Sequence, residues 1–376
     1  MKFLLIYVPN LRFSSFADPF RIYTLKEVLQ RISFPVTVDE NKLYYQIGIR
    51  SHSKGIFYKE AEIGKQIGNK RIFWIEPNCL ILNIVFAWEQ AVAKTSEKEV
   101  GMVASHRFPM YKVLNNSLDY IVDFFKTEKG KQLLQMASPG GAGRNKTLNQ
   151  DFFLNSKIYL PSLNEQLKTS ELIELIEDRI ETQIKIIDTL SSQKKQIRNL
   201  IFKDIHKNAN CCIQDYVIYE QPQKYIVHST DYLSYGKDYT PVLTANQSFI
   251  LGYTLEKDGI YEKGDCIIFD DFTNENKYVD FPFKVKSSAL KILQTKEGLM
   301  LKFFYEYLQF LNFESTDHKR HYLSEVAVTD ISVPNLKEQT FVCKIFTSFD
   351  NKLKNEEALL EKYRLQKQFL LNNLFI

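Results

Sequence analysis

Arginine, lysine, histidine and amide side chains gather in a few short polar stretches of this sequence. In the first half of the chain these residues are Arg50, His52, Lys54, Ser105, His106, Arg107, Arg144, Asn145 and Lys146. In the second half they are Lys237, Asn246, Gln247, His318, Lys319 and Arg320. Arginine and lysine can bond guanine O6 and N7, and asparagine and glutamine can bond adenine N6 and N7. The stretches therefore predict contacts to duplex DNA, although each one alone also fits ordinary solvated surface.

Other chemistry is poorly supported. Residues 140–147 resemble a phosphate-binding loop, but that pattern needs glycine directly before its lysine, and Asn145 stands there. A helical stretch also precedes this loop, where the pattern needs a buried strand. His318 and His321 beside Asp317 fit a solvated loop better than a metal site, and no nucleophile stands beside an obvious base. We therefore predict a chain without catalytic or metal-binding residues that is not an enzyme.

Composition sets broad limits. The chain has 376 residues, enough for two or three domains, and a net charge of +4, so any nucleic-acid surface has to be local. Five cysteines without C-x-x-C spacing indicate free thiols in a reducing compartment. No apolar run approaches the length of a membrane span, and residues 3–8 are too short for a secretion signal. We expect a cytoplasmic protein without membrane contact.

One stretch occurs twice and organises the rest of the chain. Residues 161–166 read Pro-Ser-Leu-Asn-Glu-Gln, and residues 334–339 read Pro-Asn-Leu-Lys-Glu-Gln, an offset of 173 (334 − 161). Ser162 and Asn335 are good N-caps, and a glutamate follows three residues later in both copies, which is the spacing of a capping box. Each copy therefore predicts the start of a helix.

A heptad of apolar residues follows each copy. It predicts two long helices that pack together, and Lys194 and Lys367 occupy the same heptad position. A parallel pair would place both lysines in one layer, where they repel, so we predict an antiparallel pair. The alternative is that each helix packs separately on its own domain.

Globular units precede the helices. We predict four segments, namely residues 1–160, 161–204, 205–333 and 334–376, in which strands, a helix, a polar loop, a strand and a long helix follow one another twice. Residues 43–50 and 80–88 are predicted strands. Residues 118–136 are a predicted helix broken at Gly130. A short helix predicted at residues 23–28 has no clear counterpart in the second unit. The fold class is α+β, a pseudo-two-fold tandem repeat in which two globular α/β domains are joined by two long antiparallel coiled-coil helices.

The repeated motif with its long helix resembles the specificity subunits of type I restriction–modification enzymes, which act in bacterial defence. The resemblance rests on residues 161–166 and 334–339, on the helices that follow them, and on the two diverged units that precede them. It implies that each unit is a target recognition domain for one half of a bipartite site in double-stranded DNA. The missing counterpart of residues 23–28 puts an identical entry of both domains into DNA in doubt.

The resemblance also implies partners and their chemistry. The helices would dock two methyltransferase subunits through Glu165, Gln166, Ile173, Ile180, Ile187, Glu338, Gln339, Leu353 and Leu360. Motor–nuclease restriction subunits would join through these, and S-adenosylmethionine, ATP and magnesium would act in the partners, with no cofactor in this chain. A coiled-coil scaffold without DNA readout is the alternative, and nucleotide turnover at residues 140–147 is a weaker one.

Overall fold

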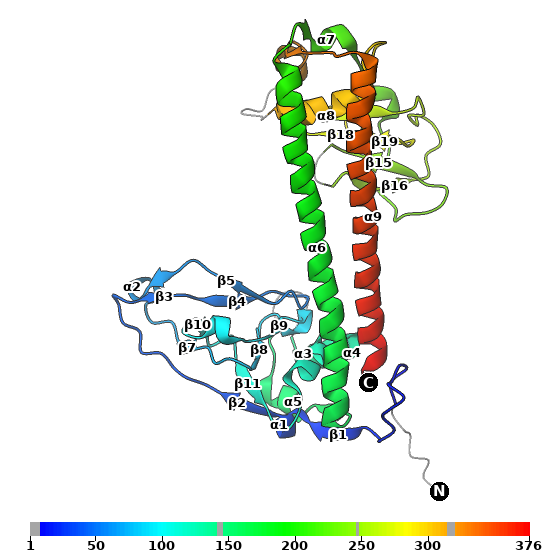
Figure 1. The fold of residues 1–376 in the computed structure, drawn as a ribbon. Coiled ribbons are helices and arrows are strands. Elements are labelled where there is room, and N and C mark those ends of the chain that lie inside the picture. Colours follow the sequence, from blue (N-terminus) through cyan, green and yellow to red (C-terminus); the bar gives the residue numbers. More distant parts are fainter. Residues whose placement is uncertain (1–7, 141–145, 246–247, 314–319) are drawn as a thin grey trace. The chain divides into compact units, whose positions relative to one another are not determined.

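The chain folds into two compact units, each of which contains part of both long helices. The computed structural model describes residues 8–140, 146–245, 248–313 and 320–376. Unit 1 comprises Met1–Ile184 with Leu359–Ile376, and unit 2 comprises Lys185–Ala358. Helix α6 spans Leu163–His206 and helix α9 spans Leu336–Leu374, shown in green and red in Figure 1. Both predicted long helices are confirmed, as is the mixed helix-and-sheet fold.

Unit 1 consists of short strands and short helices that precede α6. Its strands are β1 (Arg21–Thr24), β2 (Leu29–Ile32), β3 (Leu43–Tyr44), β4 (Ile47–Ile49), β5 (Ile56–Tyr58), β6 (Glu62–Ile63), β7 (Ile72–Trp74), β8 (Leu80–Leu82), β9 (Val92–Lys94), β10 (Val103–Ser105), β11 (Met110–Val113) and β12 (Lys157–Leu160). Its helices are α1 (Leu25–Val28), α2 (Gly64–Ile67), α3 (Leu118–Lys126), α4 (Glu128–Met136), α5 (Gln150–Asn155) and the 3-10 turns η1 (Ala87–Glu89) and η2 (Glu97–Glu99).

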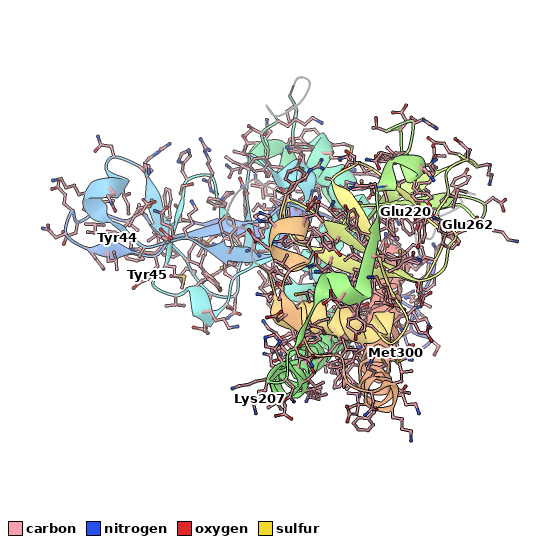
Figure 2. The ribbon with its side chains drawn as sticks, turned by 90° about the horizontal axis from the view of Figure 1, so that it is seen from above. Tyr44, Tyr45, Lys207, Glu220, Glu262 and Met300 are labelled. Atoms are coloured by element: carbon pink, nitrogen blue, oxygen red, sulfur yellow. The ribbon has the colours of Figure 1, made fainter. Side chains whose placement is uncertain are left out.

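Unit 2 has a similar composition of elements. Its strands are β13 (Cys211–Cys212), β14 (Val217–Glu220), β15 (Thr240–Leu243), β16 (Ile250–Thr254), β17 (Cys266–Asp270), β18 (Asn276–Val279), β19 (Lys284–Val285), β20 (Leu290–Thr295) and β21 (Asp330–Ile331). Its helices before α9 are α7 (Ile213–Tyr216), α8 (Leu301–Leu311), the 3-10 turn η3 (Pro222–Tyr225) and the π-helix η4 (Tyr322–Val326). Figure 2 labels Met300 at the start of α8 and Lys207 just beyond the end of α6.

Each unit contains a four-stranded sheet, and the order of equivalent strands is the same in both units. In unit 1 the strand order is β2-β11-β8-β9, and in unit 2 it is β14-β20-β17-β18, with every neighbouring pair antiparallel. A second antiparallel pair, β1 with β12 and β13 with β21, leads into α6 and α9. Because strand order and pairing both recur, the internal duplication extends to the globular parts, whose sequences share little.

The short helix at residues 23–28 does have a counterpart in unit 2, which corrects the sequence-based expectation. In unit 1 the sequence passes from β1 through α1 to β2, and in unit 2 from β13 through α7 to β14. The backbone N–H of Thr24 donates to the Glu27 carboxylate at 2.6 Å, and that of Cys212 donates to Asp215 at 2.8 Å. Cysteine and aspartate thus replace threonine and glutamate, so the second copy lacks the usual residue types of a capping box.

Three further predictions were wrong in detail. Residues 43–50 form two strands with different partners, β3 with β6 and β4 with β5. The strand predicted at residues 80–88 ends at Leu82, after which the chain turns into η1. The helix predicted at residues 118–136 breaks at Thr127 and not at Gly130. A Cβ added at Gly130 would lie 2.2 Å from the Phe124 carbonyl oxygen, so glycine lets α4 pack closely against the end of α3.

The two long helices run antiparallel within each unit. In unit 1 the Lys367 ammonium lies 2.6 Å from the Glu177 carboxylate, and in unit 2 the Lys194 ammonium lies 2.6 Å from Asp350. Moving seventeen residues forward along α6, from Glu177 to Lys194, moves seventeen residues back along α9, from Lys367 to Asp350. The antiparallel pairing expected from the shared lysine position is therefore confirmed. Packing of each long helix on its own domain alone is excluded.

The described residues contain no helix that is long and apolar enough to cross a membrane. The cysteines are free thiols, and Cys79, Cys266 and Cys343 are buried.

Candidate nucleic-acid interface

The first predicted DNA-contacting stretch forms the turn of the β4–β5 hairpin. Arg50, His52 and Lys54 are exposed there. His52 and Ser53 have φ angles of 59° and 54°, a left-handed conformation that costs a residue other than glycine on the order of 1–3 kcal/mol. Strain of this kind persists only where surrounding contacts enforce it, and it concentrates at functional sites. The left-handed backbone of the basic turn therefore has to be supported by contacts from neighbouring residues.

Residues 84–90 provide the contacts that hold this turn. The backbone N–H of His52 donates to the carbonyl oxygen of Glu89 at 2.6 Å, and that of Ser53 donates to Gln90 at 2.9 Å. The Ser51 hydroxyl donates to the Glu89 carboxylate at 2.8 Å. The strand predicted at residues 80–88 includes most of this segment, and none of its residues carries a DNA-binding pattern that would indicate a role.

Gln90 connects the same segment to the core of unit 1. Its side-chain amide donates to the carbonyl oxygens of Phe125 at 2.9 Å and Thr127 at 3.1 Å, at the junction of α3 and α4. Gln90 itself adopts a left-handed backbone conformation, with φ of 58°. The position of the basic turn is therefore fixed relative to the helices of unit 1.

The other two candidate stretches of unit 1 reach the same segment. The N–H of Ile84 donates to the carbonyl oxygen of Arg107 at 3.0 Å. The Lys146 ammonium lies 5.0 Å from the centre of the Trp88 ring. His106 and Arg107 are exposed, whereas Ser105 is half-buried. The tertiary structure thus brings all three stretches together around residues 84–90. Arg144 and Asn145 lie outside the described residues.

The candidate residues of unit 2 are placed on separate loops. Lys237 is exposed in the connection between η3 and β15. This connection contacts β16 through a backbone bridge between Leu233 and Tyr253. Arg320 is exposed before η4, with its guanidinium 5.7 Å from the centre of the Phe272 ring. The remaining predicted residues of this unit, Asn246, Gln247, His318 and Lys319, lie outside the described residues. The DNA-contacting role of the whole set stays a prediction.

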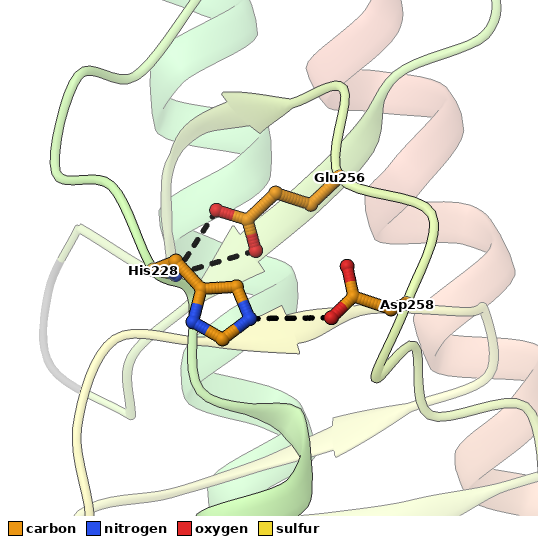
Figure 3. A group of neighbouring side chains, drawn as sticks. All are labelled: His228, Glu256 and Asp258. Atoms are coloured by element: carbon orange, nitrogen blue, oxygen red, sulfur yellow. Dashed lines mark hydrogen bonds and ion pairs between the residues drawn. The ribbon is translucent and has the colours of Figure 1, made fainter.

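One cluster in unit 2 has the residue types of a metal site. Figure 3 shows His228, Glu256 and Asp258 with their ligand atoms facing one another, all within 4.8 Å. Glu256 already accepts the backbone N–H groups of His228 and Ser229, and it pairs with the buried Lys284 ammonium at 2.9 Å. The Lys284 ammonium repels a metal ion that would bind beside it. We therefore interpret the cluster as a structural one, in which Glu256 stabilises the backbone at residues 228–229.

Gln166 and Gln339 perform the same task in the two units. Both are almost fully buried. The Gln166 carbonyl oxygen accepts the N–H of Ser117, at the start of α3, at 3.0 Å. The Gln339 carbonyl oxygen accepts the N–H of Met300, at the start of α8, at 2.7 Å. Each amide also donates to the proline carbonyl that precedes its own long helix. The repeated glutamine therefore connects each long helix to the start of α3 or α8.

A duplicated ion network reinforces this attachment. Lys126 of α3 lies 3.0 Å from Glu177, which also binds Lys367 of α9. In unit 2, Lys302 of α8 pairs with Asp350, which also binds Lys194 of α6. Each helix carboxylate is thus shared between a lysine of the other long helix and a lysine of the globular part.

The network shifts the pKa values of its acids in opposite directions. Burial raises the pKa of the Asp123 carboxyl to about 6, although Lys126 lies 2.8 Å away. Burial also opposes ionisation of Glu177, but Lys126 and Lys367 outweigh burial and hold its pKa below the usual range. The pKa of Asp350 is lowered in the same way, because Lys194 and Lys302 outweigh its burial.

Most of the residues predicted to dock partners are used inside their own unit. Gln166 and Gln339 are the anchors described above, and the Glu165 carboxylate binds the Arg12 guanidinium. Ile173 and Leu360 are buried, whereas Ile180, Ile187 and Leu353 are half-buried along the helices. Glu338 is exposed. The docking role of these residues stays a prediction.

The fold is that of the specificity subunits of type I restriction–modification systems. The S subunit from M. genitalium superposes with a TM-score of 0.61 at 14% identity, covering 98% of this chain and 99% of that one. A chain from a structural study of complex assembly and conformational transition of the type I R-M system superposes with a TM-score of 0.56 at 12% identity. The superposition covers 95% of this chain and 97% of that one. No family model matches the chain.

A sequence relative points to the same class. Over 123 residues the chain is 48% identical to the type I restriction enzyme EcoR124I/EcoR124II specificity subunit of Escherichia coli. The aligned segment covers 31% of this chain and 30% of that protein, less than a third of either. Together with the shared fold, this likeness confirms the resemblance to type I specificity subunits.

Proposed function

We propose that this chain is the DNA-specificity subunit of a type I restriction–modification complex and reads a bipartite site in double-stranded DNA. The observation that carries the proposal is the duplicated unit with diverged loops. Both units keep the same sheet order and the same glutamine anchor, but their exposed loops differ. Such an arrangement presents two different reading surfaces on one repeated scaffold. The 48% identity to a specificity subunit supports the proposal.

In unit 1, the turn at residues 50–54, the stretch 105–107 and Lys146 supply the reading surface. Their charge is local, which suits a chain whose net charge is only +4. Exposed arginine and lysine side chains on a held turn can bond either phosphates or guanine edges. Arg320 and Lys237 take this role in unit 2.

The chemistry belongs to partners in this proposal. Methyltransferase subunits, two of them by the symmetry of the repeat, bind the long helices, and restriction subunits join the assembly. S-adenosylmethionine, ATP and magnesium act in those subunits, and this chain contributes recognition without catalysis. The coiled-coil scaffold without DNA readout is not favoured, because the relative that shares 48% identity is itself a specificity subunit.

Exchange of the first recognition unit tests the proposal. Residues 8–160 are replaced by the matching unit of a related specificity subunit, and methylated bases are mapped after co-expression with the methyltransferase. We expect one half of the methylated site to change and the other half to remain. If both halves changed together, or if methylation did not depend on this chain, the two-reader proposal would be wrong.

A further inference from the structure

The chain's own N-terminal arm, residues 8–20, covers one patch on the long helices of unit 1. The Arg12 guanidinium binds the Glu165 carboxylate through two contacts of 2.7 and 2.8 Å. The Lys168 ammonium lies 5.2 Å from the centre of the Phe13 ring. An arginine beside an aromatic residue is thus the feature of the arm that meets the first turns of α6.

The arm also reaches the end of α9. The N–H of Leu11 donates to the Asn373 carbonyl oxygen at 2.9 Å, and Asn10 donates to the Asn373 side chain at 3.2 Å. Glu165, Lys168 and Asn373 are therefore the three residues that receive the arm, and we call them the arm site.

The internal repeat places an equivalent of the arm site in unit 2. Shifted by 173 residues, Glu165 becomes Glu338, Lys168 becomes Phe341, and Asn373 becomes Leu200. All three line one open groove of about 770 Å³ between the end of α6 and the start of α9. We call this groove the unit 2 groove.

Glu338, Phe341 and Leu200 of the unit 2 groove are exposed, whereas the N-terminal arm contacts the equivalent residues of the arm site. Phe341 is 66% exposed and Leu200 is 73% exposed. The Glu338 carboxylate is exposed, and within the described part of the chain it has no ion-pair partner, whereas its equivalent Glu165 is almost fully buried against Arg12. Large apolar side chains beside an unpaired carboxylate are typical of a surface that another chain covers.

The arm site and the unit 2 groove share their glutamate but differ at the other two positions. This comparison indicates which kind of segment the unit 2 groove binds. The carboxylate is retained, so the occupant presents an arginine, which binds a carboxylate in two-point geometry. Lysine and asparagine are replaced by Phe341 and Leu200, so the remaining contacts are apolar. The arm of a second copy fits poorly, because it is held on its own arm site and would lose its hydrogen bonds to Asn373. We propose that the unit 2 groove binds a partner segment in which an arginine is flanked by apolar side chains. On the basis of the proposed function, the methyltransferase subunit supplies that segment.

A photo-crosslinking residue in place of Phe341 tests the proposal in the intact complex. The full chain is co-expressed with its methyltransferase subunit, irradiated, and digested for mass spectrometry. We expect a crosslink to a methyltransferase peptide that contains an arginine among apolar residues. A crosslink to a second copy of this chain, or the absence of any crosslink in a complex that contains the methyltransferase, would overturn the proposal.

Two substitutions with matched controls measure the energetic role of the groove. Glu338→Gln and Phe341→Ser should each weaken binding of the methyltransferase subunit by about tenfold or more, because an interfacial ion pair or an aromatic anchor is lost. Glu262→Gln and Phe152→Ser change exposed residues that lie outside the groove and outside both long helices, and they should leave the affinity unchanged. All four positions are exposed, so the fold should tolerate these changes, and circular dichroism checks this.

The results separate this inference from the function on which it rests. If the wild-type complex methylates a bipartite site and both groove variants bind the methyltransferase normally, the inference is wrong and the proposed function stands. If the wild-type chain binds no methyltransferase at all, both fail.

Discussion

At the scale of single residues, the structure distinguishes the exposed basic side chains that we propose contact DNA from the groups that hold them in place. The basic side chains of the turn at residues 50–54 are exposed, but the conformation of the turn depends on Glu89, which bonds both to the Ser51 hydroxyl and to the His52 N–H. Glu89 is acidic and would be dismissed in a search for DNA-binding residues. We expect its effect on recognition to be indirect, through the strained backbone that it supports.

Replacement of Glu89 should therefore reduce discrimination more than overall binding. Glu89→Ala removes the charged acceptor of the Ser51 hydroxyl, a contact worth on the order of 1–3 kcal/mol. We expect about tenfold less discrimination between correct and altered bases in the half-site read by unit 1, with the other half-site unaffected. Competition binding of the complex to DNA duplexes measures this. Glu89→Gln, which retains an acceptor oxygen, should recover most of the discrimination. Glu60→Ala, which removes an exposed charge elsewhere in unit 1, should have no effect.

Loss of the Gln339 side chain should destabilise unit 2. Gln339→Ala leaves the N–H of Met300 and the carbonyl oxygens of Gly298 and Pro334 without their partner. A buried group left unpaired costs about 1–3 kcal/mol, and these three groups are partly buried, so we expect a total loss of roughly 2 kcal/mol. Thermal melting measures the loss, and Gln366→Ala, an exposed glutamine of the same helix, is the control. Equal melting temperatures for the two variants would show that the anchor contributes little.

At the scale of elements, the two units attach a short helix to the long helices in the same way. The short helix is α3 in unit 1 and α8 in unit 2. In each unit a glutamine bonds the backbone at the start of α3 or α8, and a lysine of that helix joins a carboxylate on the long helix. The attachments are equivalent although the surrounding sequences have diverged. Selection for a rigid connection between each globular part and the long helices would produce this pattern.

The ion network of unit 1 predicts a pH dependence. The pKa of Asp123 rises to about 6 in the folded state, from about 4 in an unfolded chain. The folded state therefore binds a proton more tightly than the unfolded state. The stability from this group is complete below about pH 4 and is lost as the pH rises through 6. Asp123→Asn removes the dependence, so the wild type should gain stability relative to the variant between pH 7 and pH 5, by on the order of 1–3 kcal/mol.

Melting temperatures of the two proteins across this pH range provide the measurement. Asp119→Asn alters an exposed acid of the same helix and serves as the control, since its side chain is 53% exposed. A constant difference between wild type and Asp123→Asn at all pH values would contradict the raised pKa of Asp123.

At the scale of the whole molecule, two copies of one architecture are linked by helices that pass through both units. Helix α6 has 44 residues, which corresponds to about 66 Å at 1.5 Å per residue. If each unit reads one half-site, we predict that helix length sets the unread gap between the halves. The ion pairs keep one antiparallel register in both units, so the two helices have to be lengthened together.

Insertion of one heptad into each helix tests this ruler. Seven residues placed between Ile184 and Lys185, and seven between Leu359 and Leu360, retain the apolar seam and add about 10 Å. At roughly 3.4 Å per base pair the gap should grow by about three base pairs, with the same two half-sites. Mapping of methylated bases measures the gap. Insertion of four residues should break the seam and lower the melting temperature. An active heptad variant with the original gap would show that the helices do not set the spacing.

The sequence alone determined the two long helices, their starts and their antiparallel pairing. These features follow from local chemistry, because a cap, a heptad and a repeated lysine are visible within a few turns of helix. The Ser162 hydroxyl and the Asn335 side chain do accept N–H groups in the first turns. In a capping box the glutamate bonds the backbone N–H of the N-cap residue. Glu165 instead binds the side chain of Arg12, which lies 153 residues away in the sequence.

Only the tertiary structure decided which residues act together. The three basic stretches of unit 1 meet around residues 84–90, whose sequence reads as a strand, and the counterpart of α1 in unit 2 is built on Cys212 and Asp215. The role of Gln166 and Gln339 as anchors also rests on backbone groups far along the chain. Contacts between distant segments leave no periodic pattern in the sequence, since they depend on how the sheets and helices pack and not on the neighbouring residues.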